Sequence, residues 1–253
     1  MRRILLALAL LGASPVAAAT PPEPTPAEII DRALEDAGGQ QYRYPGSYHF
    51  TGIYLDYRGK VEPDVHQPYE LWRVQPREHP RGRVADGKIR VSAFLNGKPS
   101  LQIAFDGQKT YDINGPTGEG GESAFWRTTM GFGMIRFALS PGYTLTRLAD
   151  DQVDNEPVRM IRVTDASGES AVFSIRKSDY RVVRVSFPTP RGLHERIFSE
   201  FFTKPGQTWV QPGRVRSFIN GEKEAEFVWK DYEIGVPLKD ELFVIQPGQY
   251  AVK

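Results

Sequence analysis

The spacing of apolar residues changes from a helical period to a strand period near residue 48. Before that point, apolar side chains recur every three or four residues, which predicts an amphipathic helix that begins at Thr25 and ends before Gly38-Gly39. Thr25, Pro26 and Glu28 form the pattern of a capping box with proline at the first helical position. The apolar stripe, which we expect to dock by one face, consists of Ile29, Ile30, Ala33, Leu34 and Ala37.

After residue 48, apolar and polar residues tend to alternate, which predicts consecutive antiparallel strands in a meander. Residues 51–57, 101–105 and 193–202 instead carry apolar side chains on both faces. This pattern predicts that parts of the second sheet face are also covered, by helices or by an apolar ligand. The hairpin-type turn dipeptides between the strands are Asp86-Gly87, Asn96-Gly97, Asp106-Gly107, Asn114-Gly115 and Asn220-Gly221.

Residues 123–139, called here the mid-chain segment, interrupt the strand pattern and predict a helix with two apolar faces. Gly131 and Gly133 lie in its middle, and each lowers helix stability by roughly 1 kcal/mol relative to alanine. A core helix gains nothing from these glycines, whereas a segment that moves can use them as hinges. We therefore expect a lid or cavity wall, with a plain core helix as the alternative. The residues predicted to contact a ligand are Phe125, Trp126, Met130, Phe132, Met134 and Phe137 in this segment, with Phe105, Phe218 and Trp229 in strands.

The beginning of the chain has the pattern of a Sec-type secretory signal peptide. Arg2 and Arg3 precede a short apolar run, and Ala17-Ala18-Ala19 supplies small residues for cleavage near Ala19. We expect a signal peptide at residues 1–19 and a single domain at residues 20–253. No other apolar run is long enough for a transmembrane anchor, and the chain has no cysteine. The expected location is the periplasm, or the outside of the cell, for a protein that folds without disulfides.

The charge and the motifs of the sequence leave few candidate residues for catalysis, metal binding or nucleic-acid binding. The net charge is +1, which argues against nucleic-acid binding. The four histidines, His49, His66, His79 and His194, have no metal-ligand spacing, and no nucleophile or phosphate-binding motif is present. The acidic residues between Asp150 and Glu156 indicate a turn between strands rather than a calcium loop. We therefore expect a protein that is not an enzyme, with no metal and no cofactor.

A local run of basic residues has two interpretations. It indicates either a solvated hairpin face or a contact site for an anionic partner, such as another cell-envelope protein. The run consists of Arg73, Arg77, Arg81, Arg83, Lys88 and Arg90.

Four short motifs resemble the LolA/LolB-like periplasmic lipoprotein carriers. Residues 105–114 are similar to that superfamily's Asp-Gly-x-x-aromatic hairpin, and residues 153–163 to its strand after a Gly-x-Pro turn, here Asn-Glu-Pro. Residues 170–186 resemble a hairpin of the family, and residues 230–245 its closing strand with an Asp-x-Leu-Phe ending. The chain departs from the pattern in being longer through residues 77–98 and in lacking a cysteine at the signal boundary.

The resemblance implies an α+β fold. A strongly curved antiparallel sheet would form an incomplete barrel, with the N-terminal helix and a mid-chain helical lid covering its concave face. It also implies a monomeric carrier whose apolar cavity takes a lipophilic ligand, such as a lipid or a lipoprotein acyl chain, without catalysis. Two alternatives remain: a non-catalytic cell-envelope interaction module whose core is filled by its own side chains, and a hydrolase.

Overall fold

The computed structural model describes residues 22–77 and 83–250. Its helices are α1 (Pro26–Asp36), α2 (Gly39–Arg43) and α3 (Ala124–Thr129), with two 3-10 helices, η1 (Phe132–Phe137) and η2 (Asp240–Phe243). The strands before the mid-chain segment are β1 (Ser47–Asp56), β2 (Asp64–Val74), β3 (Lys88–Leu95), β4 (Lys98–Phe105), β5 (Thr110–Asp112) and β6 (Gly115–Pro116). Those after it are β7 (Thr144–Arg147), β8 (Asp151–Val153), β9 (Glu156–Thr164), β10 (Ser170–Arg176), β11 (Val182–Thr189), β12 (Gly192–Phe202), β13 (Gln211–Ile219) and β14 (Glu222–Ile234).

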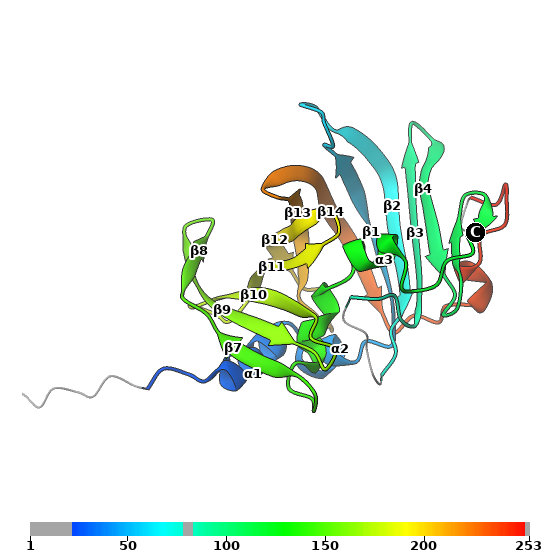
Figure 1. The fold of residues 1–253 in the computed structure, drawn as a ribbon. Coiled ribbons are helices and arrows are strands. Elements are labelled where there is room, and N and C mark those ends of the chain that lie inside the picture. The colour runs from blue at the N-terminus through cyan, green and yellow to red at the C-terminus, as the bar shows by residue number, and fades with distance from the viewer. Residues whose placement is uncertain (1–21, 78–82, 251–253) are drawn as a thin grey trace, which may run out of the picture.

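All of these strands belong to one antiparallel, strongly curved sheet (Figure 1). Its order is β6-β5-β4-β3-β2-β1-β14-β13-β12-β11-β10-β9-β7, with β8 paired to β9. The sheet therefore consists of two meanders joined where the first strand pairs with the last. Within the described residues β6 and β7 do not pair with each other, so the barrel is incomplete, as expected. The mid-chain segment connects these two edge strands and passes along the concave side (Figure 1).

The N-terminal helix forms as the sequence predicts. Thr25 caps α1, and the backbone nitrogen of Thr25 donates to Glu28 Oε2 at 2.7 Å, which completes the capping box. The apolar stripe faces the sheet, and Ile29, Ile30 and Leu34 are fully buried.

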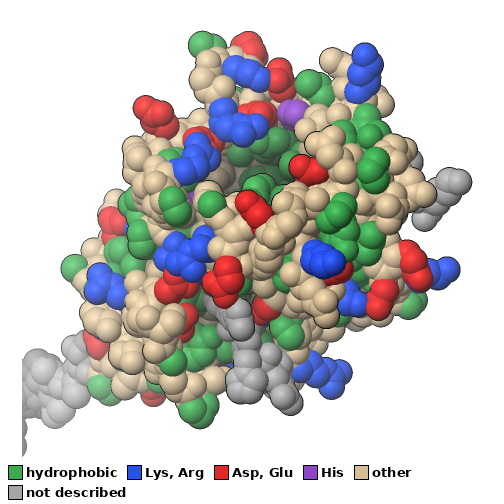
Figure 2. All heavy atoms as spheres, turned by 45° about the vertical axis from the view of Figure 1, so that its right-hand side comes forward, with side chains coloured by type: hydrophobic (Ala, Val, Ile, Leu, Met, Phe, Trp, Pro, Cys, Tyr) green, Lys and Arg blue, Asp and Glu red, His purple; other side chains and the backbone are tan. Residues whose placement is uncertain are grey.

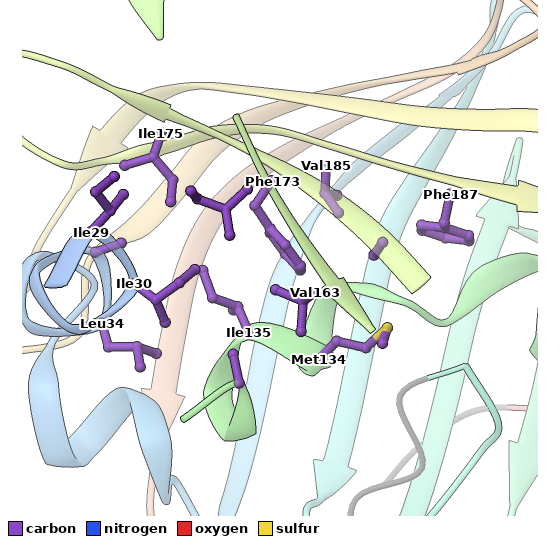
Figure 3. Close-up of a cluster of buried hydrophobic side chains, with 14 residues drawn as sticks. Ile29, Ile30, Leu34, Met134, Ile135, Val163, Phe173, Ile175, Val185 and Phe187 are labelled. Carbon is purple, nitrogen blue, oxygen red and sulfur yellow. The ribbon is translucent and has the colours of Figure 1, made fainter. Parts of the chain in front are cut away.

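One half of the concave face is filled by a continuous core. Side chains of α1 and η1 meet the inward residues of β9, β10 and β11 (Figure 3). Ile30 and Ile135 approach Phe173 from the helical side, and Val163 and Val185 lie on the strands (Figure 3). We call this cluster the packed half.

The predicted continuous helix over residues 123–139 is wrong. The segment contains the short helices α3 and η1, separated by Met130 in an extended conformation and by Gly131. Gly131 has a φ of 148°, which side-chain-bearing residues rarely adopt, and a β-carbon there would lie 2.4 Å from the Phe187 ring. The helix is interrupted at Gly131. The backbone conformation there requires glycine, and the Phe187 ring leaves no space for a β-carbon. Gly133 has no such constraint, since the nearest atom to a β-carbon is Gln75 Nε2 at 4.0 Å.

The convex face of β3 and β4 is also covered, which explains the apolar character of residue range 101–105 on both faces. The 3-10 helix η2 packs there, and Arg90 Nη1 donates to the Leu242 carbonyl at 3.0 Å. Beside it, Ser92 Oγ donates to Gln102 Oε1 at 2.6 Å. A helical cover, one of the two predicted explanations, therefore applies to this strand pair.

Several sequence predictions fall outside the described residues. These are the signal peptide at residues 1–19, His79 and Arg81, and the side chain of Phe132. In the part of the chain that is described, every helix is too short or too polar to cross a lipid bilayer.

The two glycines of the mid-chain segment provide a matched test. We expect Gly131→Ala to lower the free energy of unfolding by about 1–3 kcal/mol, because it combines an unfavourable φ with a clash against Phe187. Gly133→Ala should be neutral or stabilising by up to about 1 kcal/mol. Urea unfolding of the two variants beside the wild type measures both values, and equal effects would contradict this account of the helix break.

Candidate functional site

A cavity of about 730 Å³ lies in the other half of the concave face. This volume is within the range of roughly 300–1,000 Å³ typical of small-molecule sites. Its walls come mainly from β1, β2, β3, β12, β13 and β14, with one or two residues each from β4, β10, β11, α1 and α2, and the mid-chain segment closes one side. Figure 2 shows the molecule hollowed on one face, with hydrophobic side chains deep in the hollow and charged side chains around it. We call this part of the fold the hollow half.

Aromatic rings form the main surface of the cavity. Tyr54 stacks on Phe227 at 5.2 Å between ring centroids, and Tyr69 contacts Trp229 at the same distance. The rings come from β1, β2 and β14, and β14 lies beside the β1–β2 hairpin because the first strand pairs with the last. Leu71 and Val215 add aliphatic surface to the same lining. Large rings with few rotatable bonds give an apolar lining that keeps its shape.

Ion pairs hold the charged residues at the rim of the cavity. Arg58 Nε donates to Asp56 Oδ1 at 2.9 Å, next to the β1–β2 connection. Arg191, in the β11–β12 turn, donates from Nη1 to Glu224 Oε2 on β14 at 2.9 Å. The second pair connects two hairpins across the rim, and its arginine side chain is half exposed.

Polar contacts attach α3 and the helix break to the sheet, among them the ion pair of Arg127 with Glu169 next to β10. The indole nitrogen of Trp126 donates to Thr110 Oγ1 at 2.9 Å. His194 Nδ1 lies 2.8 Å from the Thr128 carbonyl, one of the last carbonyls of α3 that lacks a helical partner. Arg73 Nη1 contacts Met130 Sδ at 3.3 Å. The segment is thus tied to strands on both sides of the cavity.

Separate contacts attach η1. Arg136 Nη1 donates to Gln75 Oε1 at 2.6 Å, and its guanidinium lies over the Tyr42 ring at 4.5 Å. The same guanidinium is 5.3 Å from the centre of the Trp209 ring. Together with the packed half, these contacts fix η1 independently of α3.

His194 is a neutral, structural histidine. Because the Thr128 carbonyl only accepts, the Nδ1 atom of His194 carries the proton, and Nε2 accepts from Ser217 Oγ at 3.1 Å. Burial, together with the nearby positive charge of Arg196, lowers the pKa of His194 to about 3. The ring therefore keeps its connection to α3 throughout the physiological pH range.

Arg196 places a positive charge inside the hollow half. Its side chain lines the cavity, its Nε lies 3.4 Å from His194 Nε2, and its guanidinium is 5.3 Å from the centre of the Phe227 ring. Burial lowers the pKa of Arg196 to about 10, so the group remains charged at neutral pH.

Of the nine residues predicted to contact a ligand, some line the cavity and others pack elsewhere. Phe125, Trp126, Met130 and Trp229 line the cavity. Phe105 is buried behind Trp126, at 6.2 Å between ring centroids, and Phe137 packs edge-on against Tyr44 at 6.1 Å. Met134 belongs to the packed half.

Phe218 needs a correction. Its neighbours Ser217 and Ile219 on β13 line the cavity, so Phe218 points to the opposite, convex face. The sequence prediction chose Phe218 because it is hydrophobic. Without the strand pairing, the sequence could not tell which residues of this strand face the cavity. Of the two predicted hinge glycines, Gly133 lines the cavity and Gly131 packs against Phe187.

Sequence reasoning missed most of the strand residues of the cavity. Tyr54, Tyr69, Phe227 and Arg196 come from three separate hairpins, and only the strand pairing brings them together. One signal was available: Arg196 occupies a position whose neighbours two residues away, His194 and Phe198, also face inward. A charged residue in an inward-facing series is unusual and marks a site worth inspection.

Both interpretations of the basic run need correction as well. Arg73, Arg83 and Arg90 are buried, and Arg73 Nη2 pairs with Asp86 Oδ1 at 2.6 Å. Among the described members of the run, Arg77 is exposed and Lys88 is half-buried. The prediction that the whole run forms a continuous solvated face or contact patch is therefore wrong.

The acidic residues after Arg147 form a turn, as predicted. Asp154 and Asn155 connect β8 to β9 with φ angles of 49° and 66°. Asp151 pairs with Arg184 at 2.6 Å. Over residues 22–77 and 83–250, no group of three or more histidine, aspartate or glutamate side chains is arranged to hold a metal ion.

The low pKa of His194 predicts a specific loss of stability in acid. The unfolded chain binds a proton near pH 6.5, whereas the folded protein resists protonation down to about pH 3, so the free energy of unfolding falls as pH falls through this window. Between pH 7 and pH 5 the wild type should lose about 2 kcal/mol more than His194→Gln. Urea unfolding at the two pH values measures the difference, and parallel losses would disprove the assignment.

The comparisons with known proteins identify a fold. No protein-family model and no curated protein matches the chain. Among solved structures, a LolA superfamily protein from Nitrosomonas europaea is 13% identical, with a TM-score of 0.54 over 87% of this chain and 98% of that one. A DUF1329 family protein from Desulfovibrio piger is 12% identical, with a TM-score of 0.50 over 86% of this chain and 96% of that one. The resemblance to LolA superfamily proteins is confirmed at the level of the fold: an open, curved antiparallel sheet with few helices.

Proposed function

We propose that this protein is a periplasmic carrier that binds a lipophilic ligand, a lipid or a lipoprotein acyl chain, in the cavity of the hollow half. The observation that carries the proposal is the 730 Å³ cavity with its lining of aromatic and aliphatic side chains. A core filled by its own side chains, the interaction-module alternative, agrees less well with a cavity of this size. Against the hydrolase alternative, Ser217 Oγ does donate to His194 Nε2, but burial and the charge of Arg196 lower the pKa of His194 to about 3, so this imidazole is a weak base.

The energetics of an acyl ligand are favourable. Burying a CH₂ group contributes roughly 0.8 kcal/mol, so a chain of about twelve carbons supplies on the order of 10 kcal/mol. This exceeds the lower estimates of the free-energy cost of association, about 4 kcal/mol. The rigid aromatic lining reduces the further cost of ordering side chains on binding.

The proposed periplasmic location rests on the signal-peptide pattern of the sequence. The signal-peptide pattern at residues 1–19 directs the protein out of the cytoplasm, and the fold is that of LolA superfamily proteins. A carrier that works as a monomer between membranes needs neither a transmembrane anchor nor a nucleic-acid site. An envelope protein that delivers or accepts the ligand is the partner that this activity requires.

We assign the moving part of the lid to α3. It is six residues long and is attached by a small number of polar contacts, whereas η1 is built into the packed half. Gly131 separates the two helices and allows α3 to swing while η1 stays in place. Release of a ligand then requires α3 to separate from Thr110 and His194, to break the ion pair of Arg127 with Glu169 and to withdraw the buried Trp126 ring.

Filling the cavity tests the binding site. Leu71 lines the cavity on β2, and Leu71→Trp should lower the affinity for a dansyl-labelled fatty acid by about tenfold or more, because the indole occupies ligand space. Fluorescence titration measures the affinity, and native mass spectrometry of protein isolated from the periplasm measures co-purified lipid.

The control for this variant is Val228→Trp. Val228 lies on β14 between Phe227 and Trp229, which face the cavity, so its side chain points to the convex face. The control should bind like the wild type. Failure of the wild-type protein to bind any lipophilic probe, or equal affinities for both variants, would refute this location of the site.

Hydrogen exchange tests the lid. We expect the amides of α3 to exchange faster than those of β1 and β14, and to become more protected when a ligand is bound. The amides of η1 should be as protected as the strand amides of the packed half. Protection of α3 equal to that of the central strands in the ligand-free protein would contradict a moving lid.

A further inference from the structure

The end of the cavity opposite the rim is called here the deep end. The strand β1 runs from Ser47 to Asp56, and Asp56 belongs to the rim, so Tyr48 lies at the other end of the strand. Tyr48 and Tyr54 both line the cavity, and the six positions between them correspond to about 20 Å along a strand. A ligand whose headgroup stays at the rim therefore reaches Tyr48 with the end of a long hydrocarbon chain.

Aromatic rings from three parts of the chain form the deep end. Tyr42 comes from α2, Tyr48 from β1 and Trp209 from the segment before β13. The centroid of the Trp209 ring lies 5.2 Å from that of Tyr42 and 5.8 Å from that of Tyr48. Burial raises the pKa of Tyr42, Arg136 opposes this rise and Tyr48 adds to it, which indicates that the two hydroxyls are near each other. The Tyr42 hydroxyl is therefore protonated at neutral pH.

The charged and polar side chains around these rings have partners within the protein. Asp36 accepts from Arg181 Nε at 2.9 Å and from its Nη2 at 3.0 Å. The Trp209 indole nitrogen donates to Gln211 Oε1 at 2.9 Å. Arg136 donates to an amide oxygen and lies over two aromatic rings. These groups support the walls of the deep end.

The hydroxyls of Tyr42 and Tyr48 differ from these groups. In residues 22–77 and 83–250, neither hydroxyl forms a hydrogen bond with another residue. Tyr48 is only 7% exposed, so its side chain has little contact with bulk solvent. A buried hydroxyl without a partner opposes folding, whereas phenylalanine at the same position would not. Because both side chains line the cavity, a molecule bound there can supply the hydrogen bonds.

We propose that the deep end is a polar subsite, in which the hydroxyls of Tyr42 and Tyr48 bind an uncharged oxygen group, a hydroxyl or a carbonyl, at the end of the ligand's hydrocarbon chain. This inference rests on the proposed function and names the class of its ligand: amphiphiles with a second, neutral polar group remote from the headgroup. Such a group loses its hydrogen bonds to water on entering an apolar cavity, unless the site replaces them. A tyrosine hydroxyl both donates and accepts, so the pair suits a hydroxyl as well as a carbonyl.

Matched probes test the subsite. The full mature protein is titrated by calorimetry with hexadecylphosphocholine and with its ω-hydroxy analogue, each below its micelle concentration. The strongly hydrated headgroup keeps to the rim in both probes, and only the far end of the chain differs. In a purely apolar deep end, the added hydroxyl would lower the affinity by about tenfold. We expect the wild type to bind the hydroxy analogue at least as tightly as the parent compound.

Two variants remove the hydroxyls one at a time. Tyr48→Phe should lower the affinity for the hydroxy analogue by about tenfold, because the subsite loses a hydrogen-bonding partner. It should leave the affinity for the parent compound unchanged. Tyr42→Phe should act in the same direction. As a control, Tyr57→Phe removes a hydroxyl that lies directly after β1 and outside the described lining of the cavity, and it should keep both wild-type affinities.

Stability distinguishes a binding role from a structural one. The Tyr232 hydroxyl accepts from the Lys204 backbone nitrogen and donates to the Trp209 carbonyl, both at 2.9 Å, so Tyr232→Phe should lower the unfolding temperature. Tyr48→Phe should maintain or raise this temperature, since its hydroxyl has no such partners. A clear loss of stability in Tyr48→Phe would assign the hydroxyl to the fold and overturn the subsite.

The binding outcomes are also decisive. If the wild type binds the hydroxy analogue about tenfold more weakly than the parent compound, the subsite is overturned and the carrier function stands. An unchanged ratio of the two affinities in both Tyr48→Phe and Tyr42→Phe likewise overturns it. Tighter binding of an ω-carboxy analogue than of the ω-hydroxy analogue overturns the assignment to an uncharged group. Failure of every probe to bind overturns this inference together with the proposed function.

Discussion

The concave face of a curved sheet must be covered, and this constraint governs the rest of the structure. The sheet is large, whereas the helices in the described part of the chain are short. The helices α1 and η1 pack on the β9–β11 region and produce the packed half. Over the remaining concave surface, α3, η1 and residues of α1 and α2 border a space that they do not fill, and this space is the cavity. A packed core and a hollow thus coexist on one sheet.

Polar contacts act together with apolar burial in determining how the mid-chain segment sits over the sheet. The Trp126 indole, the Thr128 carbonyl and the Arg136 guanidinium each have a partner on a strand or a neighbouring loop. Such contacts are individually worth about 1 kcal/mol, because water competes for the same groups. They hold the segment in the closed geometry that defines a wall of the cavity, and the proposed opening of α3 requires these contacts to break and Trp126 to be exposed. The neutrality of His194 matters here, because protonation would change the hydrogen bonds of its ring.

Local features of the fold could be read from the sequence, and features that depend on distant pairing could not. The capping box at Thr25 and the turn at Asn220-Gly221 act within a few residues, and both form as predicted. The pairing of β1 with β14 has no local signal, yet it creates the aromatic lining. The helix break at Gly131 was hidden because apolar periodicity continues across it. Phe218 was misplaced because alternation alone does not say which face is concave.

The barrel stays open between two very short edge strands. β6 has two residues, one of them Pro116, and β7 has four. Exposed strand edges are templates for pairing with other chains, and short or proline-containing edges are poor templates. The chain can therefore separate the two sides of its opening without presenting a long row of unsatisfied backbone groups. For the proposed carrier, an apolar interior that is open to a ligand is in this way kept compatible with resistance to aggregation.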